Sequence, residues 1–355
     1  LGFARDMADR VAGVDVDSVT VHVTLLGGGF GRRLEVDYVA QAVRIAKECG
    51  GRPVQMIWPR EEDTTHDFYR PAQAAFLRAS LNAANEVTGL SIHSAGDAIT
   101  PRWFARAFPL LATPIDSPDK TTAEGLFDIP YDFANQRAAH TATHHHVPIG
   151  FWRSVGHSHN AFFSEGFIDE LAFETKQDPL EFRRRLLAKA PRHLAVLDMA
   201  AQKSAWGQPL PAGRARGVAL HESFGSIVAQ VLEVSSNAGA VRVHRAVCVI
   251  DCGTIVNPNI VAQQMESSVV FGLTAALYGR IDIVDGVVQQ TNFPSYPMLT
   301  LAQTPRVETY TVPSQRSPGG VGEPGVPPVA PALASALFAL TSKRHRTLPL
   351  GEAKA

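Results

Sequence analysis

One carboxylate near the end of the chain has an unusual setting. Glu323 lies among the glycines and prolines of residues 320–328. Glycine allows close backbone approach, while proline fixes φ and removes a donor, so this loop can hold an acid in one place. The apolar run 329–340 follows and predicts a buried helix that begins just after the prolines. We therefore expect Glu323 just before a helix N-terminus, in an apolar setting.

Such an acid could accept a proton. Burial raises the pKa of a carboxylate, whereas a nearby helix N-terminus lowers it. A carboxylate between these two effects is suited to abstract a proton at neutral pH. The alternative is an ordinary glycine–proline loop that carries a solvated glutamate.

A glycine-rich loop, residues 27–33, is the second candidate. The β-branched run 19–26 before it predicts a strand, and residues 39–47 after it have helical spacing. Glycine loops placed before helices offer backbone N–H groups to anions or oxo groups. The spacing matches neither the dinucleotide fingerprint nor a Walker loop, so a purely structural turn is the alternative.

A histidine cluster and a Trp–Arg pair occupy the middle of the chain. Arg153, beside Trp152, could bind an anion or stack, or it could be a surface arginine at a helix entry. Three consecutive histidines cannot all face one ion on regular structure, and no carboxylate stands at ligand spacing. We therefore favour a polar loop or channel lining over a metal site. The histidines are His140, His144, His145, His146, His157 and His159.

The remaining pattern predicts an α+β fold with mixed sheets and packed helices. We divide it into a first region, 1–210, with the glycine loop and the Trp–Arg segment, and a second, 211–355, with Glu323. The expected helices include 160–173, 179–189, 192–205 and 260–278; the expected strands include 53–58, 75–81, 87–93, 218–221, 227–234, 241–250 and 307–312.

Composition limits the function classes. The 355 residues are 45% hydrophobic and carry a net charge of −1, which gives no electrostatic support for nucleic-acid binding. No apolar run is expected to reach membrane-spanning length. Cys49, Cys248 and Cys252 form no paired framework. The chain begins Leu-Gly-Phe-Ala without an initiator methionine or signal-peptide pattern, which leaves open a processed product or a fragment.

Four stretches taken together resemble a known family. They are residues 27–33, 150–156, 251–266 and 319–324, and their order and composition are similar to the molybdenum-binding large subunit of the xanthine oxidase family. The nearest branch is the isoquinoline 1-oxidoreductase β-subunit type, which includes many bacterial aldehyde dehydrogenases. His66-Asp67-Phe68-Tyr69-Arg70-Pro71 also resembles that branch. The resemblance covers roughly residues 14–350.

The resemblance implies a cofactor, molybdopterin cytosine dinucleotide, whose dithiolene holds the molybdenum without side-chain metal ligands. It implies that Glu323 is the general base, that the glycine loop lies against the metal, and that Trp152 and Arg153 line the other side. Gln264 would contact the pterin. The residues assigned to cofactor binding in this way are Gly29, Phe30, Gly31, Trp152, Arg153, Gln264, Val321 and Gly322.

The implied reaction is hydroxylation with water as the oxygen source. A purine substrate is disfavoured, because the glycine loop continues Arg32-Arg33-Leu34 where purine-oxidising members read Gly-Gly-Lys-Glu. Glu124-Gly125-Leu126 likewise stands where those members have Glu-Arg-Ala. Oxidation of an aldehyde to a carboxylic acid fits better, and hydroxylation of an N-heterocycle is the second reading. The alternative of another class is a non-catalytic scaffold subunit.

The resemblance also implies partners. Relatives carry further residues upstream, with Met-Gly-Gln-Gly loops that this sequence lacks. Either the first half is a separate chain or it was cut away, and the partner that we expect is a separate chain that supplies the N-terminal half. Three cysteines are too few for two 2Fe–2S clusters, so we expect a 2Fe–2S subunit. A cytochrome c subunit, a small-molecule substrate and a periplasmic location, with the cytoplasm as alternative, follow from the branch alone.

Overall fold

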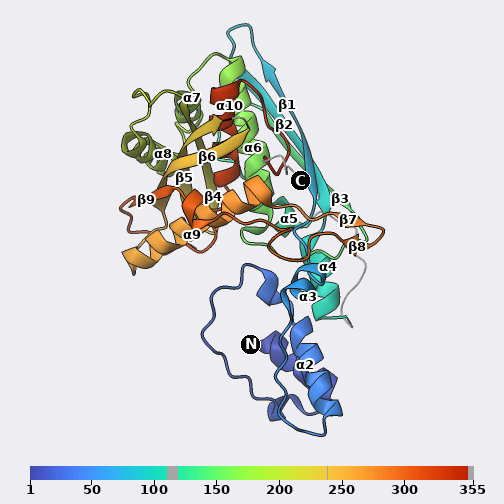
Figure 1. The fold of residues 1–355 in the computed structure, drawn as a ribbon. Helices are drawn as coiled ribbons and strands as arrows, with labels where there is room; N and C mark the ends of the chain where they lie inside the picture. The colour runs from blue at the N-terminus through green and yellow to red at the C-terminus, as the bar shows by residue number, and fades with distance from the viewer. Residues whose placement is uncertain (110–118, 238, 351–355) are drawn as a thin grey trace.

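The computed structural model describes residues 1–109, 119–237 and 239–350 (Figure 1). The chain forms an α+β fold with helices packed on mixed sheets, which confirms the expected class. The helices are α1 (Gly2–Ala12), α2 (Asp37–Glu48), α3 (Arg60–Thr65), α4 (Ile99–Ala107), α5 (Lys120–Ala123), α6 (Val155–Glu174), α7 (Pro179–Leu186), α8 (Pro191–Ser204), α9 (Pro258–Tyr278) and α10 (Val329–Thr341). The strands are β1 (Gln73–Leu81), β2 (Val87–Asp97), β3 (Gln136–Thr143), β4 (Arg214–Ser223), β5 (Ser226–Asn237), β6 (Ala240–Asp251), β7 (Ile283–Val284), β8 (Val287–Val288) and β9 (Arg306–Thr311).

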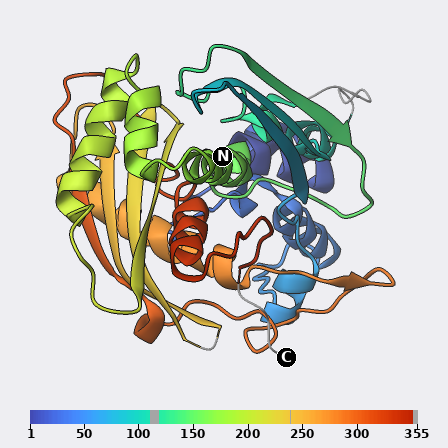
Figure 2. The ribbon, with the colours of Figure 1, turned by 90° about the horizontal axis from the view of Figure 1, so that it is seen from above.

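The larger sheet, in the order β4-β5-β6-β9, forms the centre of the core. Strands β4, β5 and β6 are antiparallel neighbours, and β9 runs parallel to β6. Successive side chains point to opposite faces, so Leu220 packs with α7 and α8 while Ala219 packs with α9 and α10. Both faces are therefore covered, as Figure 2 shows, which explains the nearly continuous apolar sequence of these strands.

The smaller sheet joins β1, β2 and β3. Strands β1 and β2 form the predicted antiparallel hairpin, and β3 lies parallel to β2. Sequence analysis missed β3, because Gln-Arg-Ala-Ala-His-Thr-Ala-Thr has no strong β pattern. Helix α6 runs between the two sheets in Figure 2 and is buried around most of its surface.

Helix α10 fixes the glutamate loop to the larger sheet. Its observed bounds confirm the predicted helix over 329–340. A Cβ atom at Gly217 of β4 would lie 2.1 Å from the carbonyl oxygen of Ala332 in α10, so only glycine permits this approach. The loop before α10 is therefore held against the edge of a rigid core.

Two predicted strands are not found as strands. Residues 19–26 and 53–58 have no regular secondary structure and join no sheet. In Figure 1 the first of them is part of a wide blue loop in the same lobe as α2. The prediction was wrong because a strand requires a neighbour, and within the described residues none lies beside either segment.

Helix α9 also corrects an expectation. By length and composition it is the one helix among the described residues that could cross a membrane, with 21 residues. However, 44% of its most apolar 18-residue stretch is buried inside the protein. Met265, Val269 and Leu273 of α9 pack in the core beside the larger sheet. Its apolar character is thus accounted for by core packing.

Candidate active site

Glu323 is bound directly to the start of α6. The backbone N–H of Ser154 donates to Glu323 Oε1 at 2.9 Å, and the Ser154 hydroxyl donates to the backbone carbonyl of Glu323 at 2.7 Å. Glu323 Oε2 has no hydrogen-bond partner among the described residues. The carboxylate is therefore oriented through one oxygen and free at the other.

The helix end beside Glu323 is not the one expected. The following helix, α10, begins six residues later, at Val329. The carboxylate instead meets the N-terminus of α6, whose N-cap is Ser154. The positive end of that helix dipole stabilises a nearby anion. Ser154 and Val155 have φ of 75° and 45°, which is a strained backbone for residues other than glycine.

Arg153 joins the Trp–Arg segment to the glutamate loop and to α9. Its Nε donates to the carbonyl of Gly322 at 2.7 Å, and its Nη atoms donate to the hydroxyls of Ser267 and Ser268 and to Gln264 Oε1 at 3.0, 2.9 and 3.2 Å. Arg153 is 4% exposed. It is thus an internal connector, not the surface arginine of the alternative reading.

The glycine loop packs against the same segment. A Cβ atom at Gly31 would lie 2.2 Å from the carbonyl oxygen of Phe151, and Gly31 has φ of 96°. The ring of Phe30 stacks on Phe271 of α9, with 5.3 Å between centroids. The close approach expected of this loop is therefore made to the protein's own backbone.

The predicted site residues largely converge. Gly31, Trp152, Arg153, Gln264, Gly322 and Glu323 come from four separate stretches of the chain and meet through the contacts above. Gly322 lies beside Gln264, since a Cβ there would be 3.8 Å from Gln264 Oε1. Gly29 lies outside these contacts; a Cβ added there would be 3.5 Å from the Cβ of Arg33. Val321 packs at the edge of the apolar core.

A second carboxyl group, that of Glu124, interacts electrostatically with Glu323. Burial raises the pKa of Glu124 to about 7, and the negative charges of Asp119, Asp128 and Glu323 raise it further against the lowering effect of Lys120. Glu124 is thus close to half-protonated at neutral pH. Sequence analysis missed this residue as a titrating group, because its raised pKa arises from burial and from distant segments.

Two buried histidines adjoin Glu124. His157 Nε2 lies 3.8 Å from Glu124 Oε2, and His157 Nδ1 is hydrogen-bonded to His221 Nε2 at 2.9 Å. Burial lowers the pKa of His157 to about 4, and that of His221 well below its ordinary value. Both imidazoles are therefore neutral at pH 7, and one donates to the other.

Two cavities meet at Trp152. The larger, of about 1680 Å³, lies between the smaller sheet, α6 and residues 279–283 and 344–349. The smaller, of about 700 Å³, is lined by Phe30, Trp152 and the side of α9 that carries Glu266. Glu323 and Gln264 line neither cavity. Phe30 and Trp152 of the predicted set therefore border open space, while the Glu323 carboxylate lines neither cavity.

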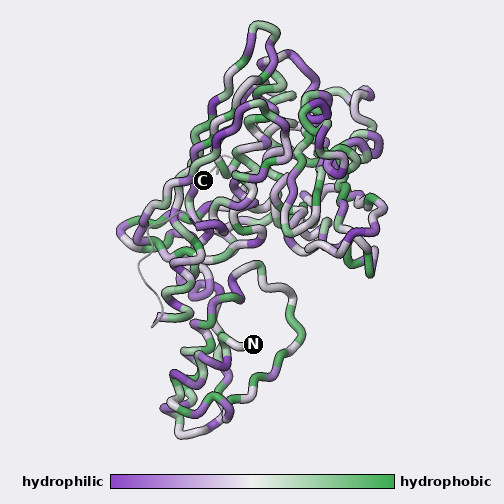
Figure 3. The backbone as a smooth tube through the Cα atoms, turned by 180° about the vertical axis from the view of Figure 1, so that it is seen from behind, coloured by the Kyte–Doolittle hydropathy of each residue, from purple (hydrophilic) through white to green (hydrophobic). Residues whose placement is uncertain are grey.

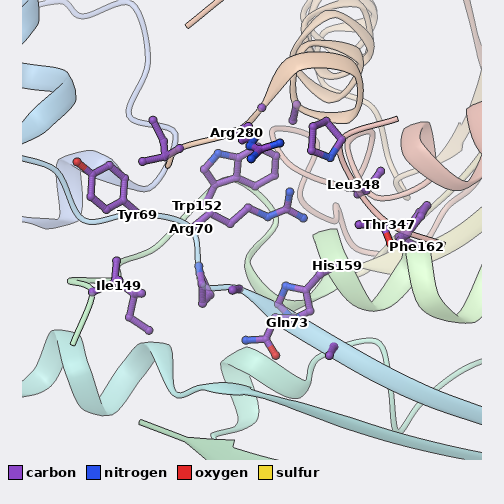
Figure 4. A pocket seen from close by; sticks show the side chains of 18 of the residues that line it. Tyr69, Arg70, Gln73, Ile149, Trp152, His159, Phe162, Arg280, Thr347 and Leu348 are labelled. Carbon is purple, nitrogen blue, oxygen red and sulfur yellow. The ribbon is translucent and has the colours of Figure 1, made fainter. Parts of the chain in front are cut away.

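Figure 4 shows the polar wall of the larger cavity. Arg70 lies across the face of Trp152, 4.3 Å from its ring centre, and donates to the Ser158 hydroxyl at 3.0 Å. Burial lowers the pKa of Arg70 to about 10, so the side chain remains a cation at neutral pH. Among the described residues, no carboxylate lies within 4 Å of its guanidinium.

Several buried polar atoms beside Arg70 lack a partner. Both amide atoms of Gln73, Oδ1 of Asp97 and Nδ1 of His159 are unpaired among the described residues. His159 Nε2 is hydrogen-bonded to the carbonyl of Thr122, so Nε2 carries the proton and Nδ1 is an available acceptor. Unpaired buried polar atoms are costly, so this wall of the cavity holds polar groups that are unsatisfied among the described residues.

The six clustered histidines separate in the structure. His140 lies on β3, His157 and His159 lie on α6, and His144–His146 lie in the loop after β3. Across residues 1–109, 119–237 and 239–350, no three His, Cys, Asp or Glu side chains gather as metal ligands.

Sequence comparison gives consistent matches. Residues 2–187 match one family described as "Molybdopterin cofactor-binding domain", and residues 187–305 match a second family of the same description. The β subunit of isoquinoline 1-oxidoreductase from Brevundimonas diminuta is 32% identical over 99% of this chain and 45% of its own length. The "Membrane-bound aldehyde dehydrogenase [pyrroloquinoline-quinone]" of Gluconacetobacter polyoxogenes is 30% identical over 95% of this chain and 46% of its own. The chain thus spans about half the length of these relatives.

Solved structures show the same fold. Quinoline 2-oxidoreductase from Pseudomonas putida 86 superposes with a TM-score of 0.77 over 98% of this chain and 70% of that one, at 14% identity. The aldehyde oxidoreductase from Desulfovibrio gigas superposes with a TM-score of 0.72 over 95% of this chain and 54% of that one, also at 14% identity. The predicted division at residue 210 stays a prediction. Together with the family matches, these similarities show that this chain belongs to the molybdopterin cofactor-binding domain family. It corresponds to the C-terminal half of a xanthine oxidase family molybdenum-binding large subunit.

Proposed function

We propose that this chain carries the proton-accepting carboxylate of a molybdenum hydroxylase that oxidises an aldehyde to a carboxylic acid, with water as the oxygen source. The observation that carries the proposal is the fixed position of Glu323. One carboxylate oxygen is held by the Ser154 N–H at 2.9 Å, and the other has no partner among the described residues. An oriented carboxylate with one open oxygen is suited to take a proton from a group placed before it.

The residues around the two cavities fit a pterin dinucleotide. Phe30 and Trp152 supply flat aromatic walls, and Arg70 supplies a cation without a carboxylate partner among the described residues. The unpaired amide of Gln73 and Nδ1 of His159 supply donors and an acceptor for a large polar ligand. When bound, the molybdenum cofactor would supply the two-electron chemistry that amino-acid side chains lack.

This chain's own residues would hold and orient the reacting groups. Glu323 Oε2 receives the proton, while the Ser154 N–H keeps the carboxylate from rotating. Arg153 fixes the glutamate loop through the carbonyl of Gly322, the residue before Glu323, and so restricts the movement of the acid. Electrons would leave through 2Fe–2S clusters on a partner subunit, because all three cysteines are free and two of them are buried.

The cytosine dinucleotide form, the hetero-oligomer and the periplasmic location belong to this proposal. The names of two relatives support partner chains, since each is named as one subunit of a larger enzyme. A cytochrome c subunit remains part of the proposed assembly. Hydroxylation of an N-heterocycle is the second candidate, and the isoquinoline oxidoreductase name of a 32% identical relative favours it.

The first test is the cofactor content of the complex purified from its native host. We expect about one molybdenum and one CMP per copy of this chain, with the CMP released on denaturation. The same sample is assayed for pyrroloquinoline quinone, because one relative's name includes it. An intact complex with neither molybdenum nor CMP would overturn the proposal and favour the scaffold alternative. Turnover of aldehydes against isoquinoline and nicotinate then separates the two substrate classes.

A further inference from the structure

Two carboxyl-bearing segments are attached to the same helix end. Glu323 is held at the N-terminus of α6 by the backbone N–H of Ser154 at 2.9 Å. The segment that carries Glu124 is held in the second turn of the same helix, where the side-chain amide of Asn160 donates to the Glu124 carbonyl at 2.8 Å. The start of α6 therefore fixes both acids, which come from distant parts of the chain.

Glycines permit the close packing at this helix end. A Cβ atom at Gly156 would lie 2.4 Å from a backbone carbonyl oxygen of α5, so only glycine lets α5 approach α6 in this way. Gly125 has φ of 77°, and a Cβ there would lie 2.7 Å from His221 Nε2 and 2.8 Å from His157 Nδ1. The segment thus leaves no room for a side chain at Gly125, and Glu124 is placed beside the two imidazoles.

His157 faces the Glu124 carboxyl group. Its Nε2 lies 3.8 Å from Glu124 Oε2, and its Nδ1 is hydrogen-bonded to His221 Nε2 at 2.9 Å, which fixes the ring. A distance of 3.8 Å is too long for a direct hydrogen bond, but one water molecule can bond to both atoms. Burial lowers the pKa of His157 to about 4, so the ring adds no charge at neutral pH.

Glu124 combines partial burial with access to solvent. Its side chain is 23% exposed, whereas that of His157 is 8% exposed. Hydrophilic and hydrophobic stretches are interspersed along the chain in Figure 3, so the polarity of the sequence does not single this residue out. Its contacts do, because Glu124 is bound to α6 through its backbone carbonyl, while no hydrogen bond to its carboxyl oxygens is made by the described residues.

The charges around Glu124 suit a group that takes up and releases a proton. Such a group works best when its pKa lies near the operating pH, and burial raises the pKa of Glu124 to about 7. The negative charge of Glu323 contributes to this rise, so the two carboxyl groups are near enough to interact. The charged and titratable groups that face Glu124 are Lys120, Asp119, Asp128, Glu323 and His157, with His221 behind His157.

Each turnover of the proposed reaction requires a way out for protons. An aldehyde and one water molecule give a carboxylic acid, two protons and two electrons, and the electrons would leave through a partner subunit. Glu323 accepts one proton and must lose it before the next turnover. With cofactor and substrate in front of its open oxygen, that side of Glu323 is closed to bulk water. The proton therefore has to leave on another side.

We propose that Glu124 takes over the proton that Glu323 accepts in each turnover and passes it to solvent. The inference rests on the proposed function, in which Glu323 is the first proton acceptor. The O–H bond of the Glu323 carboxyl breaks, an O–H bond forms on the Glu124 carboxylate, and Glu124 then releases the proton to bulk water; no electron moves. Among the described residues no hydrogen bond joins the two carboxyl groups, so a bridging water carries the proton between them.

Glu124→Gln in the complex from the native host is the first test, with molybdenum measured in the same sample. Glutamine keeps the size of the side chain but cannot accept the proton. We expect full molybdenum content, a kcat lower by about tenfold, and a kcat/KM within about twofold of wild type, because the substrate is oxidised before the proton leaves. The solvent deuterium isotope effect on kcat should rise. A loaded variant with wild-type kcat and isotope effect overturns the proposal.

Glu222→Gln is the matched control. Glu222 is a partly exposed carboxylate that pairs with His193 at 2.8 Å and acts on His157 through its charge alone. Its loss should leave kcat and the isotope effect at wild-type values. The same fall in kcat in both variants would show a general effect of lost charge and overturn the proposal.

Rescue and pH dependence separate proton transfer from a structural role. Added imidazole should restore part of the kcat of Glu124→Gln and leave wild type unchanged, because a small base replaces a lost carboxylate and does not repair a fold. Wild-type kcat should fall as the pH drops through about 7, where Glu124 becomes protonated and cannot accept. This limb should be absent from Glu124→Gln. An unchanged limb without rescue would make Glu124 structural and overturn the proposal.

Infrared titration tests the pair without turnover. The band of the protonated Glu124 carboxyl is identified by its loss in Glu124→Gln. Its midpoint should lie near pH 7 in the wild-type complex and at a lower pH in Glu323→Gln, where a negative charge that raises the pKa of Glu124 has been removed. An unchanged midpoint overturns the proposal. A complex without molybdenum would overturn the hydroxylase and the proton outlet together, whereas a loaded, active complex that is indifferent to Glu124→Gln would overturn the outlet alone.

Discussion

Ser154 and Glu323, 169 positions apart, are joined by two hydrogen bonds, one from the Ser154 backbone N–H to the carboxylate and one from its hydroxyl to the Glu323 carbonyl. This pair binds the glutamate loop to the N-terminus of α6. The acid is therefore positioned by a helix from the other half of the chain, and the orientation of its free oxygen depends on that helix end.

Loss of the Ser154 hydroxyl should loosen this connection. Ser154→Ala keeps the N–H bond to the carboxylate, and Val326 N–H still donates to the Glu323 carbonyl. We expect a loss of about 1 kcal/mol in the free energy of unfolding, a fall in kcat and unchanged molybdenum content. Ser164→Ala is the control, since its buried hydroxyl bonds the Asn160 carbonyl within α6. If both variants leave kcat equally unchanged, Ser154 does not position the acid.

Gly31→Ala should disrupt the packing of the glycine loop against Phe151. The added Cβ would meet the Phe151 carbonyl at 2.2 Å, at a φ of 96° that side chains rarely adopt. We expect a stability loss of roughly 2 kcal/mol or more and loss of bound molybdenum from the purified complex. Gly27→Ala, with nothing within 4 Å, is the matched control. Full molybdenum occupancy in Gly31→Ala would refute the assigned contact.

Arg153→Lys should be far from conservative. The guanidinium serves Gly322, Gln264 and Ser268 at once, and an ammonium group cannot reproduce that planar fork. Chemical denaturation should show a loss of about 2–3 kcal/mol. Arg44→Lys, in an exposed helix pair with Glu48, should change stability by under about 0.5 kcal/mol. Equal effects in the two variants would contradict the connector role.

Glu124 should make stability depend on pH. Its folded pKa of about 7 lies above the ordinary 4.5, so between these values the native state binds more protons than the unfolded state. Stability from this group is full below pH 4.5 and is lost as pH rises toward 7. The carboxyl is partly exposed, so after discounting for solvent screening we expect about 1–2 kcal/mol. Glu124→Gln should abolish that slope, as urea unfolding at about pH 4.5 and about pH 8 will show; an unaltered slope contradicts the assignment.

Elements that depend on their own sequence pattern were predicted well. Strands β4, β5 and β6 carry long apolar runs, and α10 follows its prolines where expected. Residues 19–26 have an equally clear strand pattern but no strand beside them among the described residues. Periodicity predicts which side of a segment is expected to be buried, but it does not show which other segment packs against that side.

For the site, too, local features were predicted from the sequence and tertiary contacts were not. Glu323 and the glycine loop were found from residue types that permit close approach. The partner of Glu323 was predicted to be the helix that follows it, yet the structure brings the N-terminus of α6. The buried pair of His157 and His221 joins residues 64 positions apart. Local pattern carries no information on such tertiary contacts, and only the folded chain brings these groups together.

The most direct test of the account is the turnover of the Glu323→Gln complex under conditions where its molybdenum content is measured in the same sample. Glutamine keeps the size of the side chain and an oxygen that can accept the Ser154 N–H, but it cannot take up a proton. We predict molybdenum and CMP equal to wild type and a kcat lower by at least about 100-fold. Wild-type turnover in a fully loaded Glu323→Gln complex would contradict the assignment of Glu323 as the proton acceptor.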